Sequence, residues 1–291
     1  MIALTVKCAA KINLYLDILY RRDDGYHEIE TLYQPIALWD RITLSPIEEG
    51  VVISGDDPAI PWDEDNLCVR SARALFDHTG FRGGVRIEVE KEIPPGAGLG
   101  GGSSDAAAIL IGCNELFGLE LSANELGDLG AGLGSDIPFF VMGRPALGKG
   151  RGEILEAVEG LSGGWILIVK PAISISTQWA YENVNLRLTR GRSGDTLKLL
   201  MQDLRGFPGK KLNTYNVFEE GVVEQYPEIG RVLRVLRGAG ADVSSLSGSG
   251  SACFALFSEA SRAEEARGQF VKEGLFTRIA RPVSRAIVLT R

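Results

Sequence analysis

Hydrophobic residues occupy every second position of residues 11–18, KINLYLDI, close to the start of the sequence. A period of two residues is typical of a β-strand that packs one face against a core. The pattern therefore predicts a half-buried strand with its aliphatic side turned inward. The intervening positions, on the face away from the aliphatic layer, are Lys11, Asn13, Tyr15 and Asp17.

Helix and strand signals alternate through the rest of the first half. Residues 65–80 have an Asp or Asn start, at Asp65 or Asn66, helical spacing of apolar positions and a glycine at the end, which predicts a helix. Residues 85–90, VRIEVE, alternate as a strand and lead directly into a glycine-rich stretch. A helix rich in small residues is predicted for 103–118. Ser122 and Glu125 have the spacing of a capping box and predict the start of the next helix.

The amino-acid composition changes at residues 143–164. These residues are rich in turn-forming types and predict a seam between two lobes. Residues 165–170, WILIVK, read as a buried strand. Later segments with amphipathic or strand-like patterns predict helices near 177–188, 216–226, 228–238 and 261–273, and closing strands near 277–290. Early strands followed by mixed helices and strands favour an α+β fold in two lobes, 1–155 and 156–291.

Composition changes this picture little, but it excludes several classes of function. The 291 residues carry a net charge of −7, so no basic face for nucleic acid is expected. No apolar run approaches the length of a membrane span, and we expect no membrane partner. The four cysteines form no C-x-x-C pair and lie in apolar runs, which predicts buried free thiols in a reducing, cytoplasmic compartment. With two histidines in the chain, a histidine-rich metal centre is improbable.

The most informative segment is the glycine-rich stretch, which has five glycines among residues 96–102 and lies between a predicted strand and a predicted helix. A loop in that position directs backbone amides toward a helix N-terminus, where phosphate binds readily. Ser103 and Ser104 add hydroxyl donors, and Asp105 is expected to cap the helix or to approach a metal. The plain alternative is a flexible turn.

Two other phosphate-loop patterns fit less well. Gly96, Gly98 and Gly101 match G-x-G-x-x-G, the dinucleotide fingerprint, but any dense run of glycines produces that match. The fingerprint also normally opens its domain, whereas here it follows predicted strands and a predicted helix. Residues 143–150, GRPALGKG, resemble a Walker A loop, yet Gly150 stands where a hydroxyl residue is needed. We interpret that segment as a turn at the seam.

The whole set of motifs resembles the GHMP kinases, named for galactokinase, homoserine kinase, mevalonate kinase and phosphomevalonate kinase. PPGAGLGGGSSDAAA (94–108) is similar to their phosphate-loop signature, AKINLYLDI (10–18) to their first motif and SLSGSGSACFAL (245–256) to their third. The resemblance implies a two-lobed fold with a ribosomal-protein-S5-like N-terminal domain and a ferredoxin-like C-terminal domain. It also implies ATP as phosphoryl donor, bound by Asn66 near the adenine and by Pro94, Pro95, Gly96, Ala97, Gly98, Leu99, Gly100, Gly101, Gly102, Ser103 and Ser104.

The same resemblance assigns catalytic roles to Asp136, in the segment GLGSDIPFF, and to Lys11. By residue type alone, Asp136 reads as a cap or turn residue and Lys11 as a solvated lysine on a strand. As family residues, Asp136 is expected to act as general base, and Lys11 to keep it ionised and to stabilise developing negative charge.

Four local sequences, among them RRDDGYHEIETLYQ (21–34) and EDNLCVRSA (64–72), are similar to one branch of the family, whose small-molecule substrate is a cytidine diphosphate derivative. By residue type, Tyr26 and His27 follow a hairpin turn at Asp24-Gly25. By resemblance, Tyr26 stacks on cytosine and His27 hydrogen-bonds to its edge. The remaining residues that the resemblance assigns to substrate are Asn13, Tyr33, Tyr181, Ser247, Gly248 and Gly250.

Magnesium is implied for phosphoryl transfer. The sequence offers few acidic ligands beyond Asp136 and Asp105, so we expect ATP and water to hold the ion rather than a protein metal site. A monomer or weak homodimer is expected. Two alternatives stay open: another small-molecule GHMP kinase, acting on homoserine, mevalonate or a sugar, and a noncatalytic ligand sensor built on the same fold.

Overall fold

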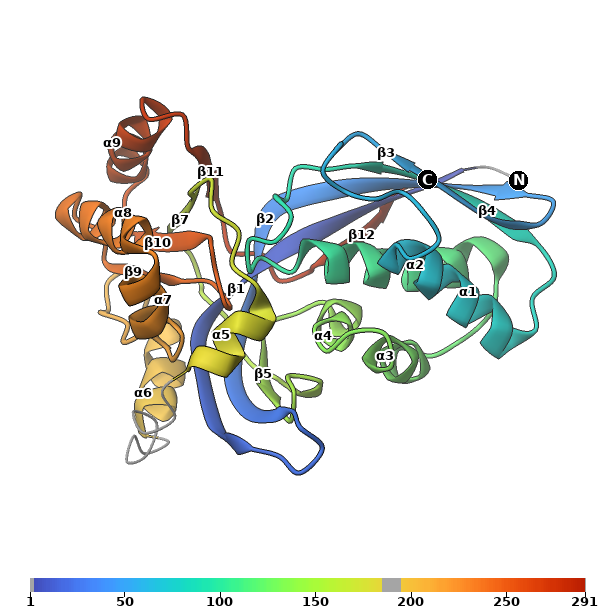
Figure 1. Ribbon diagram of the computed structural model, residues 1–291, viewed down its shortest axis with the longest axis horizontal. Helices are drawn as coiled ribbons and strands as arrows, with labels where there is room; N and C mark the ends of the chain where they lie inside the picture. The colour runs from blue at the N-terminus through green and yellow to red at the C-terminus, as the bar shows by residue number, and fades with distance from the viewer. Residues whose placement is uncertain (1–2, 185–194, 291) are drawn as a thin grey trace.

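The structure is a computed structural model that describes residues 3–184 and 195–290. Within these residues the strands form two sheets, joined by two long strands that run from the first lobe toward the second (Figure 1). The first sheet has the order β12-β1-β2-β4-β3, and β5, β6 and β8 extend it. Its strands are β1 (Leu4–Arg21), β2 (His27–Ile47), β3 (Gly50–Gly55), β4 (Gly84–Glu90), β5 (Ala146–Lys149), β6 (Ile154–Ala157), β8 (Tyr215–Asn216) and β12 (Ile287–Thr290).

The second sheet is antiparallel and has the order β11-β7-β10-β9. Its strands are β7 (Trp165–Lys170), β9 (Val243–Leu246), β10 (Cys253–Phe257) and β11 (Phe276–Ala280). Taken in chain order, these strands alternate with helices as β-α-β-β-α-β, the ferredoxin-like arrangement. The α+β fold with two sheets is therefore confirmed.

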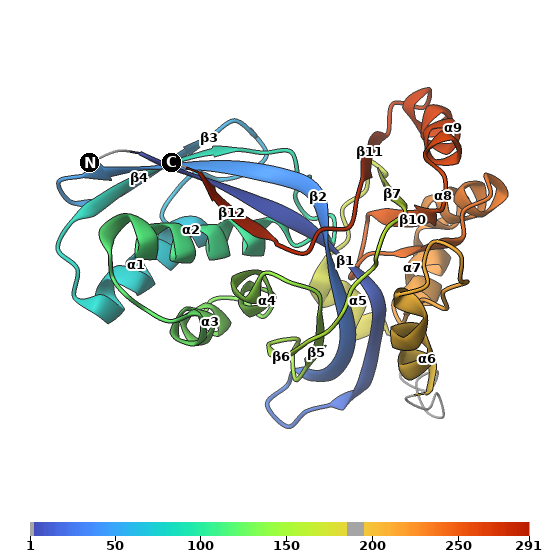
Figure 2. The ribbon, with the colours of Figure 1, turned by 180° about the vertical axis from the view of Figure 1, so that it is seen from behind.

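Helices cover one face of each sheet, as Figures 1 and 2 show. In the first lobe α1 and α2 lie under the sheet, with α3 and α4 beyond them; in the second lobe α7, α8 and α9 lie against β7, β9, β10 and β11. The helices are α1 (Leu67–Thr79), α2 (Gly101–Phe117), α3 (Ala123–Ala131), α4 (Ile137–Met142), α5 (Thr177–Asn183), α6 (Asp195–Leu204), α7 (Glu219–Gln225), α8 (Pro227–Gly238) and α9 (Ala260–Val271).

The local signals that mark helix ends are confirmed. The Asn66 side chain accepts a hydrogen bond from the Cys68 amide at the start of α1, and Ser122 and Glu125 form the complete capping box of α3. Helix α2 begins at Gly101 after Gly100, which has a φ of 73° and makes no side-chain cap. The expectation that Asp105 caps this helix is therefore wrong.

Strand β1 is more buried than the alternation predicts. Lys11, Asn13 and Asp17 are 4%, 2% and 2% exposed, so the prediction of a half-buried strand is wrong for this segment. The strand stays paired with β2 as it continues between the lobes, where Ile12 and Leu14 pack in one cluster with residues of β7 and β10. The pairing with β2 also shifts between Asn13 and Tyr15, which interrupts the simple alternation.

The turn-rich segment 143–164 contains paired strands. β5 pairs with β2, and β6 pairs with β5, so the interpretation of 143–150 as only a turn is wrong. Helix α6 has no counterpart among the sequence predictions, and the helix expected near 177–188 ends at Asn183, while residues 185–188 lie outside the described part. The C-terminal strand β12 returns to pair with β1. The lobe boundary at residue 155 stays a prediction.

All four cysteines are buried free thiols, as predicted. Among the described residues, none of the helices combines the length and the apolar character needed to cross a membrane.

Candidate functional site

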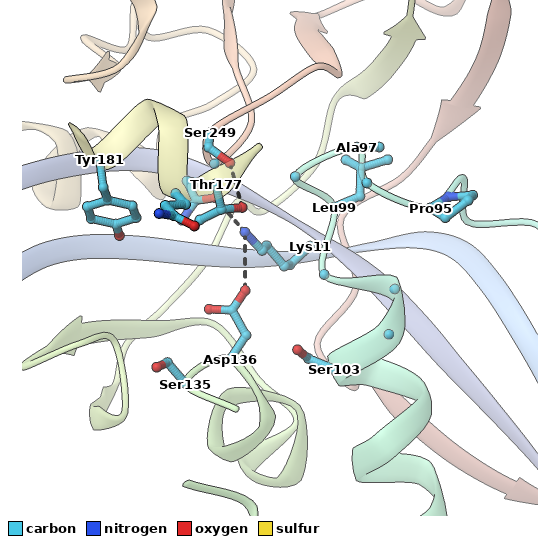
Figure 3. Close-up of a pocket in the computed structure, with 18 of the residues that line it drawn as sticks. Lys11, Pro95, Ala97, Leu99, Ser103, Ser135, Asp136, Thr177, Tyr181 and Ser249 are labelled. Carbon is cyan, nitrogen blue, oxygen red and sulfur yellow. Dashed lines mark hydrogen bonds and ion pairs between the residues drawn. The ribbon is translucent and has the colours of Figure 1, made fainter. Parts of the chain in front are cut away.

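A cleft of about 1070 Å³ lies where the two lobes meet. The glycine-rich stretch forms one wall, and β1, the start of α4, helix α5 and the loop between β9 and β10 form the others (Figure 3). The predicted residues that line it are Lys11, Asn13, Tyr26, His27, Tyr33, Asn66, Pro94, Pro95, Gly96, Ala97, Gly98, Leu99, Gly100, Gly101, Gly102, Ser103, Asp136, Tyr181 and Gly248. Residues far apart in sequence are thus brought to one site.

Glycine is required in the stretch at two positions where the chain is crowded. Gly98 has a φ of 75°, and a Cβ atom there would overlap the carbonyl oxygen of Ser247. Gly100 has a φ of 73°, and a Cβ atom there would lie 2.8 Å from the Phe140 ring. Residues other than glycine are strained at such φ values. The loop can therefore pass close to its neighbours and direct the start of α2 into the cleft, which is a geometry suited to anions.

The loop between β9 and β10 supports the glycine-rich stretch directly. The Ser247 hydroxyl donates to the Gly98 carbonyl oxygen at 2.9 Å, and the Ala252 amide donates to the Ala97 carbonyl oxygen at 3.0 Å. From the other side, Thr177 of α5 shares a hydrogen bond of 3.2 Å with Ser249. Three segments from different parts of the chain therefore hold one another at the cleft.

Lys11 and Asp136 face each other across the cleft, as Figure 3 shows. The Lys11 Nζ atom lies 3.6 Å from Asp136 Oδ2 and donates to Asn13 Oδ1 at 2.8 Å. The Asp136 residue precedes α4, but its side chain makes no capping bond to that helix. The alternatives of a solvated lysine and a capping aspartate are therefore wrong. A carboxylate beside a buried ammonium is an arrangement that can accept a proton from a bound hydroxyl.

Tyr33, which the resemblance assigns to substrate, lines the cleft and contacts Asp136. Its hydroxyl donates to Asp136 Oδ1 at 2.9 Å, and its ring is 2% exposed and packs against Phe139 with centroids 4.7 Å apart. A Cβ atom at Gly148 would lie 2.7 Å from this ring, and one at Gly152 would overlap the hydroxyl. Burial, and then the nearby Asp136 charge, raise the pKa of Tyr33, so the hydroxyl stays protonated as a donor.

The aromatic rings of Tyr26, His27 and Tyr181 line one end of the cleft. The His27 ring stacks on Tyr181 with centroids 5.1 Å apart and an angle of 30°, and burial lowers the pKa of His27, with Arg21 adding to the effect. Tyr26 is 54% exposed, and the Arg151 guanidinium lies over its ring at 4.9 Å. No local pattern in the sequence indicates Arg151, because its contact with Tyr26 joins two turns that are distant along the chain.

Three predicted residues do not line the cleft. Ser104 is fully buried, and its hydroxyl donates to the Ala9 carbonyl oxygen at 2.7 Å. Ser247 is fully buried, and its hydroxyl donates to the Gly98 carbonyl oxygen. Gly250 belongs to the same loop between β9 and β10. Asn66 does line the cleft, but its side chain serves α1 and donates to the Pro61 carbonyl oxygen at 2.9 Å.

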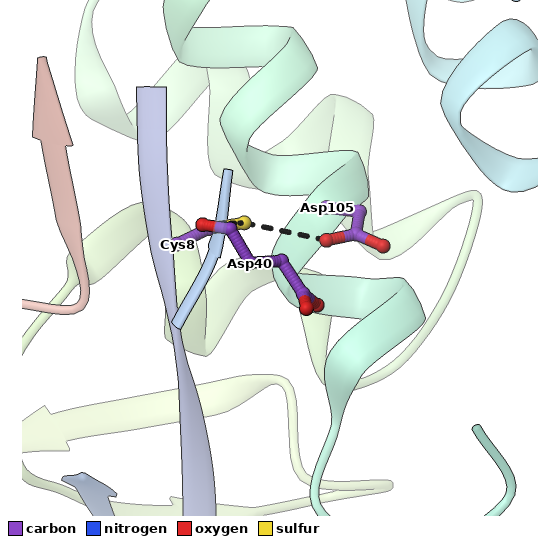
Figure 4. A group of neighbouring side chains, drawn as sticks. All are labelled: Cys8, Asp40 and Asp105. Carbon is purple, nitrogen blue, oxygen red and sulfur yellow. Dashed lines mark hydrogen bonds between the residues drawn. The ribbon is translucent and has the colours of Figure 1, made fainter. Parts of the chain in front are cut away.

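A cluster of buried charges lies beside the glycine-rich stretch. The Lys91 ammonium lies 2.5 Å from both Asp40 Oδ2 and Asp105 Oδ2, and the Cys8 thiol donates to Asp105 Oδ1 at 3.3 Å (Figure 4). Cys8, Asp40 and Asp105 are close enough to share a metal ion. The Lys91 ammonium already pairs with both carboxylates, and burial raises the pKa of the Cys8 thiol well above its usual value. The cluster is thus an ion pair network rather than a metal site.

Comparisons with known proteins agree on one family. The models described as "GHMP kinases N terminal domain" and "GHMP kinases C terminal" match residues 66–144 and 196–274. A 4-diphosphocytidyl-2-C-methyl-D-erythritol kinase of Syntrophotalea carbinolica is 42% identical over 88% of this chain and 90% of its own length. The enzyme of the same name from Geobacter metallireducens is 42% identical over 92% of this chain and 93% of its own length.

Solved structures give the same result. A crystal structure of 4-(cytidine 5'-diphospho)-2C-methyl-D-erythritol kinase superposes with a TM-score of 0.81 and 31% identity, covering 96% of this chain and 98% of that one. A homoserine kinase from Cytophaga hutchinsonii superposes with a TM-score of 0.78 at 19% identity, covering 99% of this chain and 97% of that one. At that identity the second likeness concerns the fold alone.

Proposed function

This chain belongs to the GHMP kinase family, and on that premise we propose that it is an ATP-dependent kinase for 4-diphosphocytidyl-2-C-methyl-D-erythritol. The reaction transfers the γ-phosphoryl group of ATP to the 2-hydroxyl and releases the 2-phosphate and ADP, in non-mevalonate isoprenoid precursor biosynthesis. Relatives of that name at about 40% identity over most of the chain support the substrate. The observation that carries the chemistry is the pairing of Lys11 with Asp136 in the same cleft as the glycine-rich stretch.

In this proposal the substrate hydroxyl lies between Asp136 and the γ-phosphate. Asp136 accepts the hydroxyl proton as the oxygen attacks phosphorus, while the bond to the leaving ADP oxygen breaks. Lys11 stabilises the negative charge on the attacking oxygen and on the transferred group, because it is a buried cation 3.6 Å from the base. Asn13 orients the Lys11 ammonium through a hydrogen bond of 2.8 Å.

The phosphates of ATP are proposed to lie on the glycine-rich stretch and at the N-terminus of α2, where backbone amides are available. Magnesium neutralises phosphate charge in such reactions. Among the described residues, the carboxylates that line the cleft are Asp105, Asp136 and Glu182. Asp105 is paired with Lys91 and Asp136 with Lys11, so the described lining of the cleft offers no cluster of unpaired carboxylates to chelate the ion. We infer that the phosphate oxygens of ATP hold it.

The cytosine ring is proposed to bind at the aromatic end of the cleft. Tyr26 presents an exposed ring, and the half-buried Tyr181 ring stacks on His27, which offers a polar edge. Because burial lowers the pKa of His27, the imidazole is neutral near pH 7 and can both donate and accept hydrogen bonds. Such a site suits a pyrimidine, which offers a flat face and a polar edge.

The direct test is ADP formation by the purified protein with ATP, magnesium and the cytidine diphosphate substrate. Homoserine and mevalonate serve as competing acceptors. Turnover of either of them, without turnover of the cytidine compound, would assign the chain to another branch of the family. A ligand sensor would bind ATP without forming ADP from any acceptor.

Variants of the two central residues sharpen this test. Asp136→Asn and Lys11→Ala should each reduce kcat at least about a hundredfold, because each removes a group that acts on the reacting atoms. Circular dichroism and the melting temperature should show that the variants remain folded. Near-normal turnover by either folded variant would contradict the assignment of the base or its partner.

A further inference from the structure

Both ends of the glycine-rich stretch are tied to one buried carboxylate. Asp40 of β2 accepts hydrogen bonds through Oδ1 from the amides of Glu92 and Ile93, at 2.7 and 2.8 Å. Its other oxygen, Oδ2, lies 2.5 Å from the Lys91 ammonium. A single side chain thus fixes the three residues that lead from β4 into the glycine-rich stretch.

The far end of the stretch is reached through Lys91. The same ammonium lies 2.5 Å from Asp105, which belongs to the second turn of α2. The side chains of Asp40, Lys91 and Asp105 are 0%, 4% and 6% exposed. Residues 94–100 therefore leave and re-enter the fold at two points that one ion network holds at a fixed separation.

Stability alone does not account for this network. Removing charges from water is unfavourable, and apolar residues often replace buried ion pairs without loss of stability. Here the attraction between the charges offsets even less of the cost of removing them from water, because two carboxylates share one ammonium. Burial, and then the charge of Asp105, raise the pKa of Asp40 to about 7, which records the strain of placing it there.

The place of the network indicates its use. Between its two ends the backbone passes through Gly96, Gly98 and Gly100, all with positive φ, and glycine is the residue with the greatest conformational freedom. A loop of this kind keeps a defined shape only if its ends and its contacts are fixed. We propose that Asp40 is a positioning residue for the glycine-rich stretch, acting through Lys91 and the backbone amides. The inference rests on the proposed function, in which this stretch binds the phosphates of ATP.

The test compares Asp40→Asn with the wild-type protein in the full chain. Calorimetric titration with ATP and magnesium should show a Kd for ATP raised about tenfold or more, because the loop must then be ordered on binding. The KM for the acceptor should stay within about twofold, since the change leaves the acceptor end of the cleft untouched. Hydrogen exchange at residues 94–104 should become faster in the ATP-free variant.

Asp17→Asn is the matched control. Asp17 is also a buried carboxylate that accepts a backbone amide, that of Ile18, but it does not line the cleft. This variant should lose stability without a change in ATP affinity. If Asp40→Asn does not fold, Asp105→Asn replaces it, because that change breaks the Lys91 link and leaves the bonds of Asp40 to the amides.

The outcomes separate the two proposals. Weaker ATP binding together with faster exchange confined to the stretch supports the positioning role. Equal ATP affinity in the wild type and the folded variant, or an equal loss in Asp17→Asn, overturns it. A wild-type protein that binds no ATP overturns the proposed function and this inference with it.

Discussion

At the scale of single residues, the hydroxyl of Tyr33 has a definite partner. It donates to one oxygen of Asp136, and the Lys11 ammonium lies nearest the other. The Tyr33 ring packs against Phe139, and it lies so close to Gly148 and Gly152 that a Cβ atom at either position would overlap it. The carboxylate of Asp136 is thus constrained by two groups on different sides, which fixes the direction in which it faces the cleft.

Tyr33→Phe should lower kcat about tenfold and leave both KM values within about twofold, because a hydrogen bond to a charged group is worth about 1.5–3 kcal/mol. Steady-state kinetics with each substrate varied in turn measures the two effects. Tyr15→Phe is the control, since Tyr15 is equally buried and its hydroxyl bonds to Asp17 instead. An equal fall in kcat in both variants would contradict a specific role for Tyr33.

Tyr26→Ala should raise the KM for the cytidine substrate about tenfold and leave the KM for ATP unchanged, because stacking on an aromatic ring is worth about 1–3 kcal/mol per base. The control is Tyr20→Ala in the same hairpin, where Tyr20 is 56% exposed and does not line the cleft. If only the KM for ATP moved, the cytosine site would have to lie elsewhere.

The sequence predicts single residues well where a motif fixes both residue type and place. Lys11, Asp136 and most of the glycine-rich stretch meet in one cleft as expected. Ser104 and Ser247 do not line the cleft, because their hydroxyls donate to carbonyl oxygens within the protein. The hydrogen-bond partner of a hydroxyl depends on packing between distant segments, and no local sequence pattern predicts that packing.

At the scale of elements, the glycine-rich stretch and the loop between β9 and β10 fit each other at Gly98. The carbonyl oxygen of Ser247 occupies the space that a side chain at this position would need, and the Gly98 carbonyl accepts the Ser247 hydroxyl. The two loops come from different lobes, so this contact also joins the lobes at the cleft.

Gly98→Ala should lower the melting temperature by several degrees and weaken ATP binding strongly, because it combines an unfavourable φ with a backbone overlap. Gly96→Ala is the control, since Gly96 has a similar φ of 61° but open space around the position of a Cβ atom. It should show the conformational cost alone. Equal effects on ATP affinity in the two variants would contradict the importance of the loop contact.

Helix ends and regular strands are the elements that the sequence predicts best, because caps and alternation are local. Asn66, Gly80 and the Ser122–Glu125 box all mark helix ends as expected. The short strands β5 and β6 were missed because they form by pairing with β2 and with each other, within a segment whose composition favours turns.

At the scale of the whole molecule, stability should depend on pH through Asp40. The pKa of its carboxyl is about 7 in the folded protein, against an ordinary value of 3.8. Between these two values the folded state holds a proton that the unfolded chain has lost. The contribution of Asp40 to the free energy of unfolding therefore falls as the pH rises from about 4 to about 7, and it is constant above that range.

Urea unfolding between pH 5 and pH 8 measures this dependence. The free energy of unfolding should fall less steeply with pH in Asp40→Asn than in the wild-type protein, because the variant has no carboxyl at this place. Lys91, Asp105 and Cys8 also face Asp40, and Lys91 stays charged throughout this range, because the two carboxylates raise its pKa despite burial. An unchanged slope would show that Asp40 is ionised across the whole interval.

The sequence predicts two lobes and their order, but not how the chain connects them. Strand β1 belongs to the first sheet, yet its middle packs on the second, and a strand from the end of the chain completes the first sheet. Such pairings join positions separated by most of the chain, so no pattern in a short window reveals them.

The pairing of β12 with β1 has a consequence for synthesis on the ribosome. Residues 5–8 are made about 280 residues before their partners, residues 287–290. At about 5–20 residues per second, this edge of β1 waits at least about a quarter of a minute for its partner. During that time the nascent chain presents an open strand edge, which is a template for unwanted pairing. Lys7, which lies on this edge, is a charged residue of the kind that discourages such pairing.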